Sequence, residues 1–206
     1  MISRRTLLAG GLVVLPLAAC GAQEGPPAEV PAGDDFHGSR LPSGPDLPDV
    51  TLTDTTGSPF NLANDFTTPV VALFFGYTNC PDVCPGIMAD MATARRRLED
   101  DLASQVSLAV ITTDPARDTP DALGEYLERV DSDFIGLTGD ITDILAAAAP
   151  LGIAIEEGKQ LPSGGYEVDH SAQILGFNHE GWMEALWTQP SIGDLRDDLA
   201  TLVGEA

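Results

Sequence analysis

The sequence predicts an α/β domain with a central mixed β-sheet, flanking helices and an added N-terminal hairpin. Two apolar, β-branched runs, residues 70–75 and 106–112, have the composition of strands that are buried on both faces. A segment with helical periodicity follows each run. Because two parallel strands joined by a helix form a right-handed crossover, these two strands are expected to pair in parallel.

The first elements are a hairpin, a strand and a long helix. Apolar and polar residues alternate over 50–53, which predicts a strand. Residues 54–58 are rich in turn residues, and residues 60–62 are expected to form the returning strand of a hairpin. The buried strand at 70–75 ends at Gly76. An amphipathic helix is expected to start at the cysteines that follow and to continue to about residue 103.

The second half of the chain continues the alternation. Thr119 before Pro120 is typical of a helix start, with an N-cap and a proline at the first helical position. Ser191 with Asp194 forms a capping box for the last helix. An alanine-rich helix is expected at 140–149, a polar loop at 156–166, and strands at 134–137, 153–155, 172–177 and 183–187. This order is that of a thioredoxin-like sandwich.

The first residues predict a leader rather than part of the domain. Arg4 and Arg5 precede an apolar stretch, residues 7–19, which is too short to span a bilayer and is typical of a signal peptide. The segment Leu17-Ala18-Ala19-Cys20 resembles the lipobox of bacterial lipoproteins. The resemblance implies cleavage after residue 19 and acylation of Cys20, which would hold the protein on the extracytoplasmic face of the cell membrane.

Two further segments complete the expected organisation. Residues 20–48 contain many prolines and glycines and little periodicity, which predicts a flexible tether. Residues 49–206 are expected to form the folded domain. The formal net charge is −22, and removal of residues 1–19 takes away two arginines and no acid, which lowers the charge to −24. Such a charge argues against nucleic acid as a partner.

Cys80 and Cys84 are the candidate functional pair. If Cys20 carries lipid, these are the remaining two of three cysteines, in an oxidising compartment. They follow the buried strand at the point where α/β sheets place their sites, and the free amides of a helix start favour a thiolate there. A structural disulfide, a redox pair and two ligands of a metal site are all possible. The three-residue spacer favours a chelate, because thioredoxin-type exchange uses a two-residue spacer.

Three motifs together resemble the Sco/SenC copper-binding proteins, which assist assembly of the CuA centre of cytochrome c oxidase. They are Gly76-Tyr77-Thr78-x-Cys80-Pro81-Asp82-Val83-Cys84-Pro85, Thr113-Asp114-Pro115-x-Arg117-Asp118-Thr119-Pro120 and Val168-Asp169-His170-Ser171. The similarity covers about residues 47–204, although residues 174–179 depart from the aromatic-aliphatic strand and Asp-rich turn of the family. The resemblance implies that Cys80 and Cys84 are thiolate copper ligands, that His170 is the imidazole ligand, and that the fold is thioredoxin-like with an inserted hairpin.

The chemistry of this ligand set agrees with copper. Thiolates suit Cu(I), and imidazole suits copper in either oxidation state. Zinc would require a fourth ligand, which the sequence does not clearly supply. Asp114 and Asp169 are candidates for hydrogen bonds to the ligands, with a turn role as the alternative for Asp114. Core packing is expected for Met88 and Met91, and solvation for His37 and His179.

The leading expectation is a metallochaperone without turnover that delivers copper to, or matures, the CuA site in cytochrome c oxidase subunit II. The alternative is a thiol-disulfide oxidoreductase in which Cys80 and Cys84 reduce the oxidase cysteines for metal insertion. The two functions differ in their need for His170, because exchange needs only the two cysteines. A peroxidase is disfavoured because the Thr-x-x-Cys pattern of peroxiredoxins is absent at Cys80.

Overall fold

The computed structural model describes residues 35–160, 166–170 and 172–206, and the side chains of 156–171 are not included in that description. The predicted leader and Cys20 lie outside the described residues. Within the described ranges, no helix is both long enough and apolar enough to span a bilayer.

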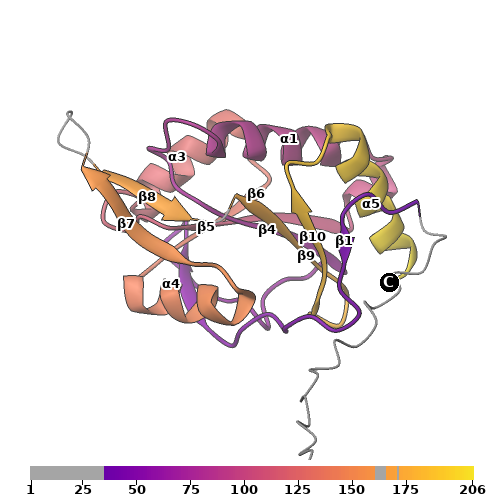
Figure 1. Ribbon diagram of the computed structural model, residues 1–206, viewed down its shortest axis with the longest axis horizontal. Helices are drawn as coiled ribbons and strands as arrows, with labels where there is room; N and C mark the ends of the chain where they lie inside the picture. The colour runs from indigo at the N-terminus through magenta and orange to yellow at the C-terminus, as the bar shows by residue number, and fades with distance from the viewer. Residues whose placement is uncertain (1–34, 161–165, 171) are drawn as a thin grey trace, which may run out of the picture. The chain divides into compact units, whose positions relative to one another are not determined.

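An eight-stranded mixed sheet lies at the centre of the domain (Figure 1). Its strand order is β1-β10-β9-β4-β5-β6-β2-β3. The pairing of β4 with β5 is parallel, as the two buried runs predicted, and β6 joins them in parallel. The N-terminal hairpin β2–β3 is present at one edge. The strands of this sheet are β1 (Ser39–Arg40), β2 (Thr51–Asp54), β3 (Pro59–Asn61), β4 (Val70–Gly76), β5 (Val106–Thr112), β6 (Phe134–Thr138), β9 (Gln173–Phe177) and β10 (Met183–Thr188).

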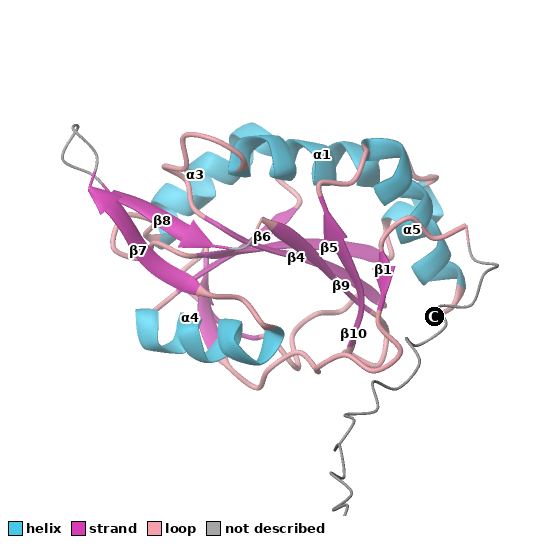
Figure 2. Cartoon of the chain, viewed as in Figure 1, coloured by secondary structure: helices cyan, strands magenta, loops and turns pink. Residues whose placement is uncertain are grey.

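Helices cover both faces of the sheet (Figure 2). One core cluster joins the sheet to α1, α3 and α5, and a second joins its other face to α4. Met88 and Met91 are at most 1% exposed in the first cluster, which confirms their expected core packing. The helices are α1 (Cys84–Arg96), α2 (Asp100–Ala103), α3 (Pro120–Val130), α4 (Ile141–Ala148) with the 3₁₀ turn η1 (Ala149–Leu151), and α5 (Ile192–Gly204). The thioredoxin-like α/β sandwich is therefore confirmed.

The helix expected from the cysteines to residue 103 is shorter and interrupted. It begins at Cys84, so Cys80 lies in the turn before it, and it ends at Arg96 before the short helix α2. The Arg95 side chain donates hydrogen bonds to the backbone carbonyls of Ala103 (3.1 Å) and Val106 (3.0 Å). These bonds hold the returning chain against the end of α1, and helical periodicity alone does not predict them.

A second, two-stranded sheet occupies the region that was expected to be mainly loop. It consists of β7 (Ile155–Gln160) and β8 (Tyr166–His170), which pair antiparallel outside the main sheet. A strand pair that is not part of the layered core does not require alternating apolar residues, and the polar composition of this segment therefore resembled a loop.

The folded domain begins before residue 49, the start that the sequence suggested. Strand β1 pairs with β10, and Leu47 is 8% exposed. Asp198 in α5 anchors this segment: it is fully buried, and its carboxylate accepts hydrogen bonds from the backbone N–H groups of His37 and Gly38, both at 2.8 Å. The Trp187 indole donates to the same carboxylate at 2.7 Å.

The His37 side chain is exposed, as expected, but it also contacts this anchor. Its Nδ1 lies 3.1 Å from the Asp198 carboxylate. This hydrogen bond, opposed by partial burial, raises the pKa of His37 above its ordinary value.

Replacing Asp198 with Ala should lower the free energy of unfolding by about 3 kcal/mol, because buried donors on the backbone and on Trp187 lose their acceptor. Urea denaturation measures the effect. The neighbouring Asp197 has an exposed side chain, so Asp197→Ala is the control and should change stability by less than about 0.5 kcal/mol. Equal losses in the two variants would contradict the anchoring role of Asp198.

Candidate metal centre

The two cysteines lie just beyond the carboxyl end of β4, as the sequence predicted. The strand ends at Gly76, where an added Cβ would come within 2.5 Å of the Phe74 ring, so only glycine fits without rearrangement. The carbonyl of Gly76 accepts a hydrogen bond from the backbone N–H of Thr113 at 2.8 Å. The cysteine loop and the loop that contains Asp114 are therefore neighbours.

The sulfur atoms of Cys80 and Cys84 meet even though only one cysteine is helical. Both are unbridged. Cys84 is fully buried as the first residue of α1, while Cys80 is partly exposed and its N–H donates to the carbonyl of Tyr77 at 3.3 Å. The Cys84 thiol donates a hydrogen bond to the Cys80 sulfur. This contact is what a shared metal ion or a reversible disulfide would need.

The two thiols differ in acidity. Burial opposes ionisation of Cys80, but hydrogen bonds from the Cys84 thiol and from the backbone N–H groups of Asp82, Cys84 and Val83 lower its pKa. Burial first, and then the hydrogen bond to Cys80, raises the pKa of Cys84. Cys80 is thus the more acidic and more accessible of the two thiols, and Cys84 is the buried one that ionises less readily.

A buried carboxylate that sequence reasoning did not single out, that of Asp118, holds the cysteine loop. It is fully buried and accepts hydrogen bonds from the backbone N–H of Thr78 (2.9 Å), the Thr78 hydroxyl (2.5 Å) and the Thr112 hydroxyl (2.7 Å). Its backbone carbonyl accepts from the Thr138 hydroxyl at 2.8 Å. One residue therefore joins the cysteine loop to the ends of β5 and β6. The available signal was that Asp118 and Thr78 both belong to the motifs that surround the site.

Asp114 is occupied within its own loop. It is 1% exposed, and the Arg117 guanidinium donates to its carboxylate. Its backbone N–H donates to the Thr112 hydroxyl at 3.0 Å. Arg117 in turn lies 5.8 Å from the centre of the Tyr77 ring. These contacts support a role in shaping the loop, and a hydrogen bond from Asp114 to a metal ligand stays a prediction.

Tyr126 of α3 is a further neighbour of the sulfurs. It packs against the core cluster that contains Cys84, and its buried hydroxyl has no hydrogen-bond partner among the described residues. Burial and then the charges of Cys84 and Cys80 raise the pKa of Tyr126. The Thr113 hydroxyl is also buried and has no hydrogen-bond partner in the part of the chain that the structure describes.

The side chains of His170 and Asp169 lie outside the described part of the chain. The backbone of His170 ends β8 and pairs with Ile155, which packs against the cluster that contains Cys84. Among the residues whose side chains are described, no group of three or more His, Cys, Asp or Glu is arranged to hold a metal ion. The role of His170 as a third ligand stays a prediction. His179 is exposed in the β9–β10 turn, as expected.

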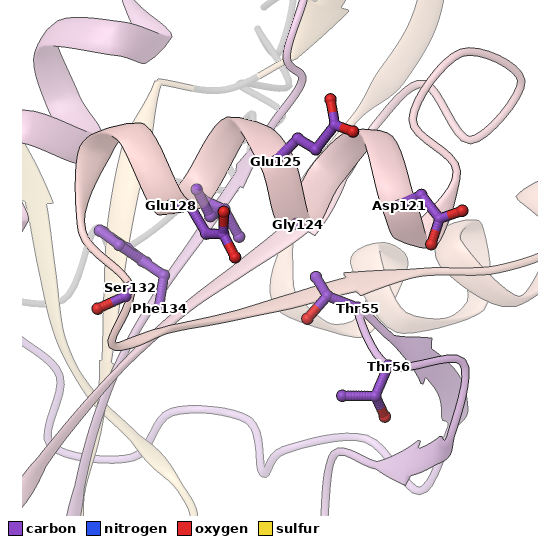
Figure 3. Close-up of a pocket in the computed structure, with 9 residues that line it drawn as sticks. Thr55, Thr56, Asp121, Gly124, Glu125, Glu128, Ser132 and Phe134 are labelled. Atoms are coloured by element: carbon purple, nitrogen blue, oxygen red, sulfur yellow. The ribbon is translucent and has the colours of Figure 1, made fainter.

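A hollow of about 450 Å³ lies beside α3 and is not lined by either cysteine. Figure 3 shows Asp121 and Glu128 of α3 on one side and the threonines of the β2–β3 turn on the other, with Glu125 pointing away from the threonines. No cysteine or histidine is among the described residues that line it. Its donors are hard oxygen atoms, so it does not offer the soft ligands that copper prefers.

Asp118→Ala should lower the free energy of unfolding by about 3 kcal/mol, because Thr78 and Thr112 lose a buried acceptor. It should also speed alkylation of Cys84, since the loop that covers this thiol is no longer held. Denaturation and timed labelling with iodoacetamide measure the two effects. Asp121→Ala, at an exposed position of α3, is the control, and unchanged labelling of Cys84 in Asp118→Ala would contradict the positioning role.

The comparisons with known proteins agree with this geometry. A protein of Stutzerimonas stutzeri named for copper binding is 34% identical over 141 residues, which cover 68% of each chain. The mitochondrial relatives are longer: the matched part spans 47% of SCO2 from Saccharomyces cerevisiae. The apo Sco1 structure from Thermus thermophilus has a TM-score of 0.71 at 29% identity and covers 83% of this chain and 97% of that one. The copper-bound ScoI of Bradyrhizobium japonicum has a TM-score of 0.67 at 28% identity, with 78% and 98% covered.

The family model described as SCO1/SenC matches residues 47–203, which include the whole cysteine loop, the Asp118 loop and His170. The resemblance seen in the three motifs is thereby confirmed. The chain belongs to the SCO1/SenC family.

Proposed function

We propose that this protein binds copper through Cys80, Cys84 and His170 and delivers it to the CuA site of cytochrome c oxidase subunit II. The observation that carries the proposal is the pair of unbridged, hydrogen-bonded sulfurs at the end of β4. Two soft sulfur donors in one place favour Cu(I) over harder ions. The Bradyrhizobium and Stutzerimonas relatives, one solved with copper and one named for it, support the same metal.

The thiol asymmetry supports capture of the cargo in two steps. Cys80, the more accessible and more acidic of the two thiols, is placed to take a soft cation first. Cys84 must then release its proton to become the second ligand, so copper binding is expected to release protons and to weaken as pH falls. An imidazole from His170 would complete a three-coordinate site and extend it to Cu(II).

The same asymmetry also favours a second candidate, thiol-disulfide exchange. The Cys80 thiolate would attack a disulfide, and one partner sulfur would leave with the electron pair. Cys84 would then lose its proton and attack the mixed disulfide. The products are a reduced dithiol on the partner and a Cys80–Cys84 disulfide on this protein. His170 takes no part in these steps, which makes it the residue that separates the two functions.

The test is copper titration of the reduced protein under anaerobic conditions with His170→Ala and, as control, His179→Ala. We expect the control to keep a sulfur-to-Cu(II) charge-transfer band and His170→Ala to lose it, with copper affinity reduced by at least about 10–100-fold, since even residues behind the ligands have effects of that size. Reduction of a model disulfide should be unchanged in both variants. The oxidised, disulfide form should bind copper far more weakly than the dithiol form.

Two outcomes would contradict the proposed function as a copper chaperone. One is equal copper uptake by the dithiol and disulfide forms. The other is normal oxidase maturation in His170→Ala cells when Cys80→Ser cells fail, which would leave exchange as the function.

We also propose that acylated Cys20 holds the protein on the extracytoplasmic face of the membrane. The lipobox-like residues 17–20 support this. Cys20→Ala should abolish incorporation of labelled fatty acid and move the protein from the membrane fraction to the soluble fraction. A variant that keeps its acyl chain and its membrane retention would exclude Cys20 as the anchor.

A further inference from the structure

A groove of about 320 Å³ opens directly beside the cysteine loop. Asp82 and Val83, two of the three residues between the cysteines, form one end of it. The groove continues along the first turns of α1 and reaches the loop between β10 and α5, at Gln189 and Pro190. Its volume is at the lower end of the range of about 300–1,000 Å³ that is usual for ligand sites. The groove therefore adjoins the segment between the two cysteines, although neither cysteine is among its lining residues.

The lining of the groove is apolar at the base and acidic at the rim. Ile174 is buried at its base, and Val83 and Ile87 are half-buried along it. Asp82 is exposed and Asp90 half-buried, and neither carboxylate has a hydrogen bond or an ion pair with another described side chain. These two charges are available to an external cation, which the net charge of −22 would attract further.

Backbone strain is found at the same groove. Gln189 has φ = 50°, and it is the one non-glycine residue with positive φ among residues 35–160, 166–170 and 172–206. A left-handed conformation is unfavourable for such a residue and tends to persist where it serves binding. Gln189 and the following Pro190 both line the groove.

We propose that this groove binds an extended segment of the partner protein in which a basic residue lies beside an apolar one. The apolar side chain fills the base over Ile174, the basic side chain pairs with Asp90, and a cysteine of the segment comes next to Cys80. The identity of the partner as the copper-receiving protein rests on the proposed function, but the recognition chemistry does not. An acidic segment is disfavoured by both rim carboxylates, and a small anion by the absence of a basic residue in the lining.

Gly86 offers a way to add bulk to the groove. A Cβ added at this lining residue meets no heavy atom within 4 Å, so Gly86→Trp introduces a large side chain there without a clash at its Cβ. Gly204, at the end of α5, is equally open, and Gly204→Trp is the matched control. Asp90→Lys tests the role of the acidic rim. Its matched control is Glu125→Lys, which changes the net charge equally but lies in the hollow on α3.

The experiment uses two synthetic peptides and the reduced protein without copper. Each peptide has one cysteine, carried as a mixed disulfide with thionitrobenzoate, and a neighbouring Leu; one has flanking Lys residues and the other flanking Glu residues. The Cys80 thiolate attacks the peptide sulfur, the S–S bond breaks, and thionitrobenzoate leaves as a coloured thiolate. The initial rate of colour release measures docking. Neutral dithiodipyridine, which needs no groove, reports the intrinsic reactivity of Cys80 in every variant.

We expect the unaltered protein to prefer the Lys peptide. Asp90→Lys should reduce this preference by about fivefold more than Glu125→Lys, the size of one surface charge pair. Gly86→Trp should slow the Lys peptide by at least about tenfold relative to Gly204→Trp, and dithiodipyridine rates should stay similar in all four variants. Equal peptide rates in either matched pair of variants would contradict the proposal that the groove binds the segment. Because this assay contains no copper, that result would leave the copper titration of the same proteins as an independent measure of the proposed function.

Discussion

The buried carboxylate of Asp118 is the contact on which the arrangement of the site depends. The residues between β4 and α1 are not part of the sheet, so no ladder of backbone hydrogen bonds fixes their path. Asp118 supplies the missing acceptor to Thr78 on one side and to Thr112 on the other. Burying a carboxylate is costly unless donors surround it, and here they come from two loops. The same contact therefore satisfies the charge and fixes the distance between the loops.

The difference between the two thiols follows from this placement. Cys84 is held in the first helical turn, inside the core, where burial favours the neutral form. Cys80 stays in the preceding turn, within reach of the free N–H groups of the helix start. A longer helix beginning at Cys80 would have satisfied some of those N–H groups within the helix and removed the donors that stabilise the thiolate. The interrupted geometry, rather than the i, i+4 spacing of a helix, brings the two sulfurs together.

The parts of the fold that sequence reasoning recovered are those with a local signal. The runs at 70–75 and 106–112 are apolar enough to predict buried parallel strands, and Thr119-Pro120 and Ser191 mark helix starts that the structure contains. The position of Cys80 and Cys84 beyond a buried strand has such a local signal as well, whereas the part of His170 stays a prediction. What sequence reasoning missed depends on polar contacts between distant residues, as for Gly38 with Asp198, which are 160 positions apart. Such contacts have no period, so neither the docking of residues 35–48 nor the role of Asp118 could be predicted from a pattern.

The acidic character of the chain acts at two ranges. A net charge of −22 creates a field that draws any cationic partner or metal ion toward the molecule, but ionic strength screens it beyond about 10 Å. Attraction at long range therefore cannot choose between the hollow on α3 and the groove beside the cysteines, since both have acidic residues. The choice has to be made at contact, where the two differ: of these two hollows, only the groove is lined by residues of the cysteine loop, Asp82 and Val83, and by the left-handed Gln189. Charge thus raises the frequency of encounters, whereas the position of the groove beside the cysteine loop is what would make the proposed docking productive.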